Sequence, residues 1–138
     1  MQRSEMADGT ATAEFAVTLP FGPDAARVAR TMVSQLLIEH ECDGQLVEDG
    51  RLVAHELVMN GVRHGAPDER TEIAVSCRLL DGHVVIAVQD QGRAGTVAVR
   101  AASGHSVDGR GLAIVEALSE RWTVDRSGGT RVEAWLAR

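Results

Sequence analysis

A carboxylate and an amide stand four residues apart in the segment 55–64, at Glu56 and Asn60. Positions four apart on a helix share a face, and this pair would lie beside the apolar stripe that contains Val53 and Leu57. An asparagine oxygen can bind Mg²⁺, and a glutamate can orient or deprotonate a hydroxyl group. Taken alone, the pair is more simply explained as solvated polar groups on a helix flank.

A second cluster, Asp90, Gly92 and Gly95, comes directly after an apolar segment. Asp90 continues the face formed by Val84, Ile86 and Val88, so its carboxylate could accept a hydrogen bond from an adenine amino group. Gly92 would let the base approach the backbone closely. Alone, the cluster also fits a charged strand end followed by a glycine turn.

Thr130 is a weaker element of the same kind, because it shares a strand face with Val132, Ala134 and Leu136. Its hydroxyl could assist Asp90 at the base. The preference of threonine for strands explains its presence equally well.

The third cluster, Gly109, Arg110, Gly111 and Leu112, precedes an apolar helical segment. Glycines at a helix start leave backbone N–H groups free for phosphate oxygens, and Arg110 would add positive charge. The spacing is neither that of a Walker loop nor that of a full dinucleotide fingerprint. Alone, it also fits an ordinary glycine-rich helix start.

Apolar periodicity and glycine or proline breaks predict the elements that would position these clusters. The predicted helices cover 24–41, 45–64 and 111–120, with Asp43 as the cap of the second; His55 and His64, in the second helix, are expected to be structural. The predicted strands cover 14–19, 71–80, 83–89, 122–126 and 130–136, and 90–108 is a long loop. This order predicts an α+β fold, a two-layer α/β sandwich with a mixed, mostly antiparallel sheet and helices on one face. Residues 1–12 are expected to form a flexible lead-in to one domain, 13–138.

Composition narrows the class of protein. The chain has 138 residues, 44% of them hydrophobic, which suits a single globular domain. Its net charge of −6 argues against direct nucleic-acid binding. No apolar run suits a membrane span or a secretory signal, so we expect a cytoplasmic protein. Cys42 and Cys77 lack metal-site spacing and are expected to be buried free thiols.

In this order, the clusters resemble those of the ATPase superfamily of gyrase, histidine kinases and MutL, whose fold is called the Bergerat fold. The segment Glu56-x-x-x-Asn60 resembles its N box, Asp90-x-Gly92 its first glycine box, and Gly109-x-Gly111-Leu112 its second. Gly129-Thr130 before the last strand also fits. The resemblance covers residues 14–137, and the ordered set is far more specific than any one motif.

Within this superfamily the chain resembles the compact bacterial anti-sigma-factor serine kinases, chiefly through the segment 56–65. The resemblance implies a kinase that uses ATP and Mg²⁺, binds a sigma factor and phosphorylates a serine of an anti-anti-sigma protein. It implies Glu56 as catalytic base and Asn60 as the Mg²⁺ ligand. The nucleotide site that we expect comprises Asn60, Asp90, Gly92, Gly95, Gly109, Arg110, Gly111, Leu112 and Thr130. Family members often dimerise, and the moderately apolar first helix permits a homodimer.

One position departs from the family pattern, because Ala94 stands where the first glycine box usually has its second glycine. In addition, we expect the segment 95–109 to form a short lid. A domain with so short a lid would bind nucleotide weakly or would need a partner to close the lid. The alternative is a regulatory module that binds a partner, with or without nucleotide, and has no kinase activity. A sensor histidine kinase is a further rival, but its phosphoaccepting hairpin precedes the ATPase domain, and here the first strand and helix already belong to that domain. A two-layer domain of unrelated function also remains open.

Overall fold

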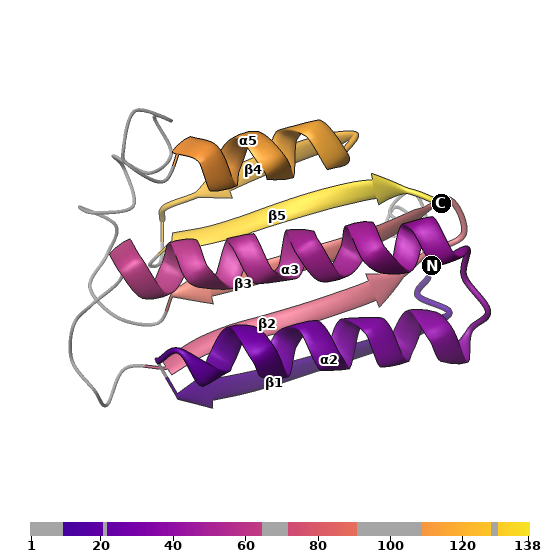
Figure 1. Ribbon diagram of the computed structural model, residues 1–138, viewed down its shortest axis with the longest axis horizontal. Helices are drawn as coiled ribbons and strands as arrows, with labels where there is room; N and C mark the ends of the chain where they lie inside the picture. Colours follow the sequence, from indigo (N-terminus) through magenta and orange to yellow (C-terminus); the bar gives the residue numbers. More distant parts are fainter. Residues whose placement is uncertain (1–9, 21, 65–71, 91–108, 128–129) are drawn as a thin grey trace.

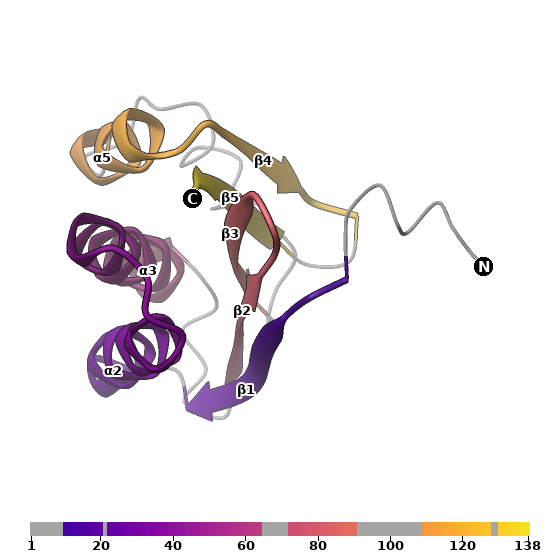
Figure 2. The same cartoon turned by 90° about the vertical axis from the view of Figure 1, so that its right-hand side faces the viewer.

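The computed structural model describes residues 10–20, 22–64, 72–90, 109–127 and 130–138. Its elements are β1 (Ala13–Pro20), α2 (Asp24–Glu39), α3 (Gly44–His64), β2 (Glu72–Leu79), β3 (His83–Asp90), α5 (Gly109–Leu118), β4 (Arg121–Asp125) and β5 (Thr130–Ala137). Helices α2, α3 and α5 cover one face of the sheet (Figures 1 and 2). The predicted two-layer α+β sandwich is therefore confirmed.

The sheet has the strand order β1-β2-β3-β5-β4, and all of its neighbouring strands pair antiparallel. A tight turn at Asp81-Gly82 joins β2 to β3, and the Leu80 N–H donates to the His83 carbonyl at 2.8 Å. Such short turns suit the right-handed twist of neighbouring strands. The predicted hairpin is thus present, and the strand order brings β5 beside β3.

The core lies between the sheet and the helices. Because side chains alternate along a strand, every second residue of β2, β3 and β5 faces the helices. These inner-face residues are Ile73, Val75, Cys77, Leu79, Val84, Ile86, Val88, Val132, Ala134 and Leu136. On the outer face of the sheet, Val85 and Trp135 form a smaller buried cluster with Leu80. Strand β3 is therefore buried on both faces, as its sequence predicts.

The connection between α2 and α3 differs from the prediction. Helix α2 ends at Glu39, two residues before the predicted end. The Cys42 N–H donates to the Leu37 carbonyl and the Glu41 N–H to the Ile38 carbonyl, each at 3.0 Å. This is the Schellman pattern, in which glycine usually occupies the left-handed position. Here Glu41 has a φ of 59°, so no glycine marks the end of the helix.

The start of α3 follows the prediction, because Asp43 Oδ2 accepts a hydrogen bond of 3.0 Å from the Gln45 N–H. Helix α5 begins and ends two residues earlier than predicted, at Gly109 and Leu118, and β4 is shifted by one residue in the same direction. Strand β3 extends one residue further, through Asp90. Residues 91–108 of the predicted loop and 1–9 of the predicted lead-in lie outside the described residues.

Along the described ranges, no helix combines the length and the apolarity that crossing a membrane requires.

Candidate functional site

Two polar side chains lie next to each other at one end of the inner face. Asp90 ends β3 and Thr130 begins β5, and the antiparallel register makes them cross-strand neighbours. Their exposed fractions are only 5% and 7%. Burial of a polar group costs free energy unless the group is hydrogen-bonded, so a buried hydroxyl beside a buried carboxylate gives this end of the apolar face a polar character. Thr130 Oγ1 is buried and has no hydrogen-bond partner among the described residues.

Asn60 has a second buried side-chain oxygen without a hydrogen-bond partner among the described residues. It lies in the last turns of α3, is half-buried, and its Oδ1 atom is buried without a hydrogen-bond partner in the described part of the chain. A buried carbonyl oxygen of this kind is the hard ligand that Mg²⁺ takes in proteins. Asn60 therefore fits the role of a single protein ligand to a magnesium–nucleotide complex.

Glu56 lies one helical turn before Asn60 and is also half-buried. Its carboxylate makes no hydrogen bond or ion pair with any residue that the structure describes. A carboxylate without a structural partner is available to accept a proton from a bound hydroxyl group.

Gly61 brings this part of α3 close to the sheet. A Cβ atom on Gly61 would lie 2.9 Å from Ile73 Cδ1 and 3.9 Å from Val88 Cγ1. Ile73 lies on β2 and is the cross-strand neighbour of Asp90. The helix turn that contains Asn60 and Gly61 therefore packs on the strands next to Asp90. Sequence reasoning assigned Gly61 no role, although a glycine inside a strongly helical segment is itself a signal of close packing.

The start of α5 lies at the same end of the molecule as the end of α3, the end of β3 and the start of β5 (Figure 1). Gly109, Arg110 and Gly111 form the first turn of α5, and the buried Leu112 anchors it. The first N–H groups of a helix have no acceptor within the helix, so this turn offers the donors that the sequence analysis predicts. The side chain of Arg110 and the positions of Gly92 and Gly95 lie outside what the structure describes.

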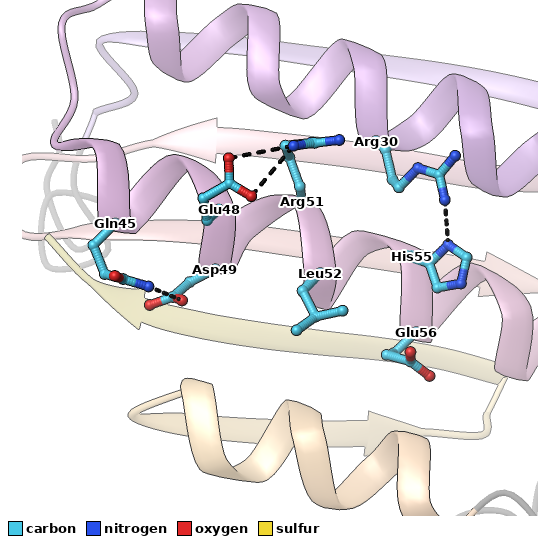
Figure 3. Close-up of a pocket in the computed structure, with 8 residues that line it drawn as sticks. All are labelled: Arg30, Gln45, Glu48, Asp49, Arg51, Leu52, His55 and Glu56. Atoms are coloured by element: carbon cyan, nitrogen blue, oxygen red, sulfur yellow. Dashed lines mark hydrogen bonds and ion pairs between the residues drawn. The ribbon is translucent and has the colours of Figure 1, made fainter.

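A groove runs along the outward side of α3 and ends at Glu56 (Figure 3). It has a volume of about 480 Å³ and is lined by Arg30, Gln45, Glu48, Asp49, Arg51, Leu52, His55 and Glu56. Within it, Arg51 pairs with Glu48 at 3.3 Å, and the Gln45 amide donates to Asp49 at 2.9 Å. Glu56 therefore faces a groove whose other carboxylates already have partners.

The groove also contains a contact between the two helices that sequence reasoning did not predict. Arg30 of α2 lies 2.9 Å from His55 of α3, measured from Nη1 to Nδ1. His55 was expected to be structural, and the structure places its ring in this contact between α2 and α3, in the lining of the groove. The two residues are 25 positions apart, and no pattern within either helix indicates the contact.

The two cysteines lie in different environments. Cys77 is buried on the inner face of β2, whereas Cys42 is only partly buried, so the prediction of two buried thiols is correct for Cys77 alone. Burial, with a smaller contribution from Cys42, raises the pKa of Cys77 to about 12. Among the described residues, no group of three or more His, Cys, Asp and Glu side chains could hold a metal ion.

Comparison with solved structures finds the same fold. The RsbU and RsbW domains of Rv1364c from Mycobacterium tuberculosis match with a TM-score of 0.69 and 29% identity, over 92% of this chain and 33% of that chain. The present chain thus spans about a third of the length of that solved chain. The histidine kinase domain of the blue-light activated histidine kinase from Erythrobacter litoralis EL346 matches with a TM-score of 0.57 and 16% identity, over 96% of this chain and 68% of that chain, which shows a shared fold alone.

At the level of sequence, a search of curated proteins found no match. The family model of the histidine kinase-like ATPase domain, by contrast, matches residues 19–136, which is most of the chain. The chain therefore belongs to the family of histidine kinase-like ATPase domains.

Proposed function

We propose that this chain is a serine protein kinase that binds Mg-ATP, phosphorylates an anti-anti-sigma protein and binds a sigma factor, and so regulates transcription. The observation that carries the proposal is the polar end of the inner face. Asp90 and Thr130 lie there as buried neighbours, and Asn60 on the adjoining turn of α3 has a buried, unpartnered oxygen. Family membership supports nucleotide binding, and the sequence resemblance to anti-sigma-factor kinases supports the partners.

In this proposal Asp90 recognises the base. Its carboxylate accepts a hydrogen bond from the adenine amino group, and Thr130 Oγ1 offers an adjacent hydroxyl that can donate or accept. Both side chains are almost fully buried, so their hydrogen bonds form away from water, where the electrostatic interaction is stronger. Gly92 and Gly95 would bring the following backbone close to the base.

Asn60 Oδ1 would hold the magnesium ion, and the backbone N–H groups of Gly109, Arg110, Gly111 and Leu112 would bind phosphate oxygens. When bound, Mg²⁺ neutralises negative charge on the transferring phosphoryl group. Glu56 Oε would accept the proton of the serine hydroxyl. Positioning and charge stabilisation dominate phosphoryl transfer, and the residues assigned here supply those two functions.

Calorimetric titration with Mg-ATP tests the nucleotide site. We expect micromolar binding to the wild-type chain, and a loss of at least about tenfold in Asp90→Asn and Asn60→Ala. Thr123→Val, on the exposed face of β4, is the control and should bind as the wild type does. Absence of binding at millimolar Mg-ATP would overturn the proposal for the isolated chain.

A phosphotransfer assay tests Glu56. Candidate anti-anti-sigma proteins from the same organism are incubated with the chain and radiolabelled ATP, and incorporated label is measured. Glu56→Gln should abolish transfer while Mg-ATP binding stays within about twofold of wild type. Glu48→Gln is the matched control, because it removes a groove carboxylate that pairs with Arg51. Transfer retained by Glu56→Gln would remove the catalytic role.

A second candidate function is a partner-binding regulator without kinase activity. It is favoured by Ala94, which replaces a glycine of the family pattern. Under this alternative, partner binding survives Asn60→Ala and needs no nucleotide. Partner binding that requires both Asn60 and Mg-ATP would exclude it.

The proposal places the functional unit in residues 13–138 and includes a homodimer. Light scattering of the full chain tests the oligomeric state, since a monomer mass across the working concentration range would contradict a dimer.

A further inference from the structure

A glycine stands in the last turn of α3, where intrinsic helical propensity disfavours it. Gly61 lies just before the end of the helix at His64. Glycine within a helix is less stable than alanine, so a compensating contact is expected at this position. The contact is the close approach to the sheet, because a Cβ atom on Gly61 would lie 2.9 Å from Ile73 Cδ1. Carbon atoms normally pack at about 3.5–4.0 Å, so this position has no room for a methyl group.

Ile73 has little freedom to move away from α3. Its side chain is 0% exposed. In the register of the sheet it lies between Leu19 of β1 and Asp90 of β3, so its strand is paired on both sides. Protein interiors are close-packed, and a methyl group added at Gly61 would therefore displace the end of α3 rather than the strands. The displacement needed to restore a normal contact is about 1 Å.

Asn60 would move with this turn of the helix. It precedes Gly61 in the chain, and its Oδ1 atom is buried without a hydrogen-bond partner among the described residues. Mg²⁺ takes oxygen ligands at about 2.0–2.1 Å in near-ideal octahedral geometry, so a shift of about 1 Å would break such a bond. Asp90 and Thr130 lie instead on the paired strands β3 and β5, which a shift of α3 leaves in place.

We propose that Gly61 is a positioning residue whose contact with Ile73 sets the distance between the Asn60 oxygen and the sheet, and thereby the contribution of Mg²⁺ to nucleotide binding. The inference rests on the proposed function, because that function assigns the magnesium ion to Asn60. It separates the metal contact, which depends on how closely α3 packs on β2, from the base contacts, which depend on the pairing of β3 with β5.

The test compares ATP binding with and without the metal ion. Calorimetric titrations are made in Mg²⁺ and in EDTA, and the ratio of the two dissociation constants, the Mg²⁺ ratio, is the readout. We expect a Mg²⁺ ratio of at least about tenfold for the wild-type chain and less than about threefold for Gly61→Ala. Metal-free ATP affinity of Gly61→Ala should stay within about twofold of wild type, whereas a general loss of folding would lower both affinities.

A second substitution should rescue the first. Ile73→Val removes the Cδ1 atom that the new methyl group would meet, so Gly61→Ala/Ile73→Val exchanges one methyl group for another and nearly conserves the core volume. The double variant should return the Mg²⁺ ratio to within about twofold of wild type, and Ile73→Val alone should keep it. If Gly61→Ala does not fold, the double variant still tests the inference, because a lost Mg²⁺ ratio there would overturn it.

Gly50→Ala is the matched control. Gly50 lies on the same helix, and a Cβ atom there would also meet a leucine, Leu37 of α2, far from Asn60. Gly50→Ala should keep the Mg²⁺ ratio whatever its effect on stability. A wild-type ratio in Gly61→Ala, or a loss that Gly50→Ala shares, would overturn the positioning role. Reduced metal-free affinity at an unchanged ratio would also overturn it, because Ile73 and Asp90 would then have moved instead of the helix.

NMR of the ligand-free chain distinguishes this inference from the proposed function. The side-chain amide signals of Asn60 should shift in Gly61→Ala and return towards their wild-type positions in Gly61→Ala/Ile73→Val. Because Ile73 is distant in sequence, the return reports the position of Asn60 and not the substitution beside it. Signals that Ile73→Val does not restore would overturn the positioning role whether or not the chain binds nucleotide. Restored signals in a chain that binds no Mg-ATP would overturn the nucleotide function and leave the helix–sheet contact as the determinant of Asn60 position.

Discussion

The two ends of the inner sheet face are built in opposite ways. At one end, which we call the packed end, the side chains of Leu79, Val84 and Leu136 are almost completely buried in apolar surroundings. At the other end the same three strands bring together Ile73, Asp90 and Thr130. The first end stabilises the fold through burial of apolar surface. The second holds buried polar atoms, one of which has no described partner, so its residues are better explained by binding than by stability.

Two glycines of α3 show the same contrast. A Cβ atom on Gly50 would lie 3.0 Å from Leu37 Cδ1 and 3.3 Å from Val33 Cγ1, so Gly50 lets α3 pack closely on α2. Gly61 serves the polar end, where it places α3 against Ile73 of the sheet. The two close approaches fix opposite ends of one helix, and only the second lies beside candidate site residues.

The largest expected difference concerns the thiol at the packed end. Because burial raises the pKa of Cys77 from 9.0 to about 12, its thiolate population at pH 8 falls about a thousandfold. We expect Cys77 in the folded chain to resist alkylation by iodoacetamide while the partly exposed Cys42 reacts. Mass spectrometry of timed samples measures both, with Cys42→Ser as the control. Rapid labelling of folded Cys77 would show that this end opens readily.

The same pKa shift gives the packed end a pH dependence. The unfolded chain loses the Cys77 proton above pH 9.0, whereas the folded chain keeps it up to about 12. The unfolded state therefore binds fewer protons in this range, and the free energy of unfolding falls as the pH rises from 9.0 towards 12. Below pH 9.0 this contribution is constant.

A truncation at the packed end should have the largest effect on stability. Leu136 is 1% exposed, and Leu136→Ala removes buried contacts and leaves a cavity, which costs about 3 kcal/mol. Urea denaturation monitored by tryptophan fluorescence measures the change. Leu52→Ala, at a side chain that is 41% exposed, should cost less than about 1 kcal/mol. Similar decreases in the free energy of unfolding for Leu136→Ala and Leu52→Ala would contradict the view that burial at the packed end stabilises the fold.

Periodicity was sufficient to predict the layers of the fold. The apolar stripes of α2 and α3 and the alternation along β2 predict which faces are buried, because burial follows helical and strand geometry directly. The strand order β1-β2-β3-β5-β4 was not predicted, since pairing between distant strands leaves no periodic signal within either strand. The early end of α2 was missed because Glu41, and not glycine, adopts the left-handed conformation there.

Glu41 adopts a left-handed backbone conformation that is unfavourable for a residue with a Cβ atom. The φ of 59° at Glu41 costs a residue with a Cβ atom about 1 kcal/mol relative to glycine. Glu41→Gly should therefore raise the free energy of unfolding by up to about 1 kcal/mol, with some of the gain offset by the larger entropy of the unfolded chain. Urea denaturation measures it, and Gln35→Gly, at an exposed position within α2, should destabilise. A loss of stability in Glu41→Gly would show that its side chain makes a stabilising contact.

The candidate site was predictable in part. The sequence assigns Asp90 and Thr130 to the apolar faces of their strands, whereas only the structure shows that β3 and β5 pair and that the two residues are cross-strand neighbours. The contact between Arg30 and His55 could not be predicted, because it depends on how α2 and α3 pack. Residues that share one element can be grouped from sequence, whereas contacts between elements depend on the tertiary arrangement.

The smallest expected change in stability is at the polar end, and it distinguishes the two ends most directly. Thr130→Val replaces a buried hydroxyl that has no described partner with a methyl group of similar shape. Because no intramolecular hydrogen bond is lost, the free energy of unfolding should stay constant or rise by less than about 1 kcal/mol. Mg-ATP affinity should fall about fivefold, since the bound base loses one hydrogen bond. Thr123→Val should alter neither quantity. Urea denaturation and calorimetry on the same samples separate the two effects. A variant that loses stability but binds nucleotide as the wild type does would place Thr130 with the packed end, as a structural residue.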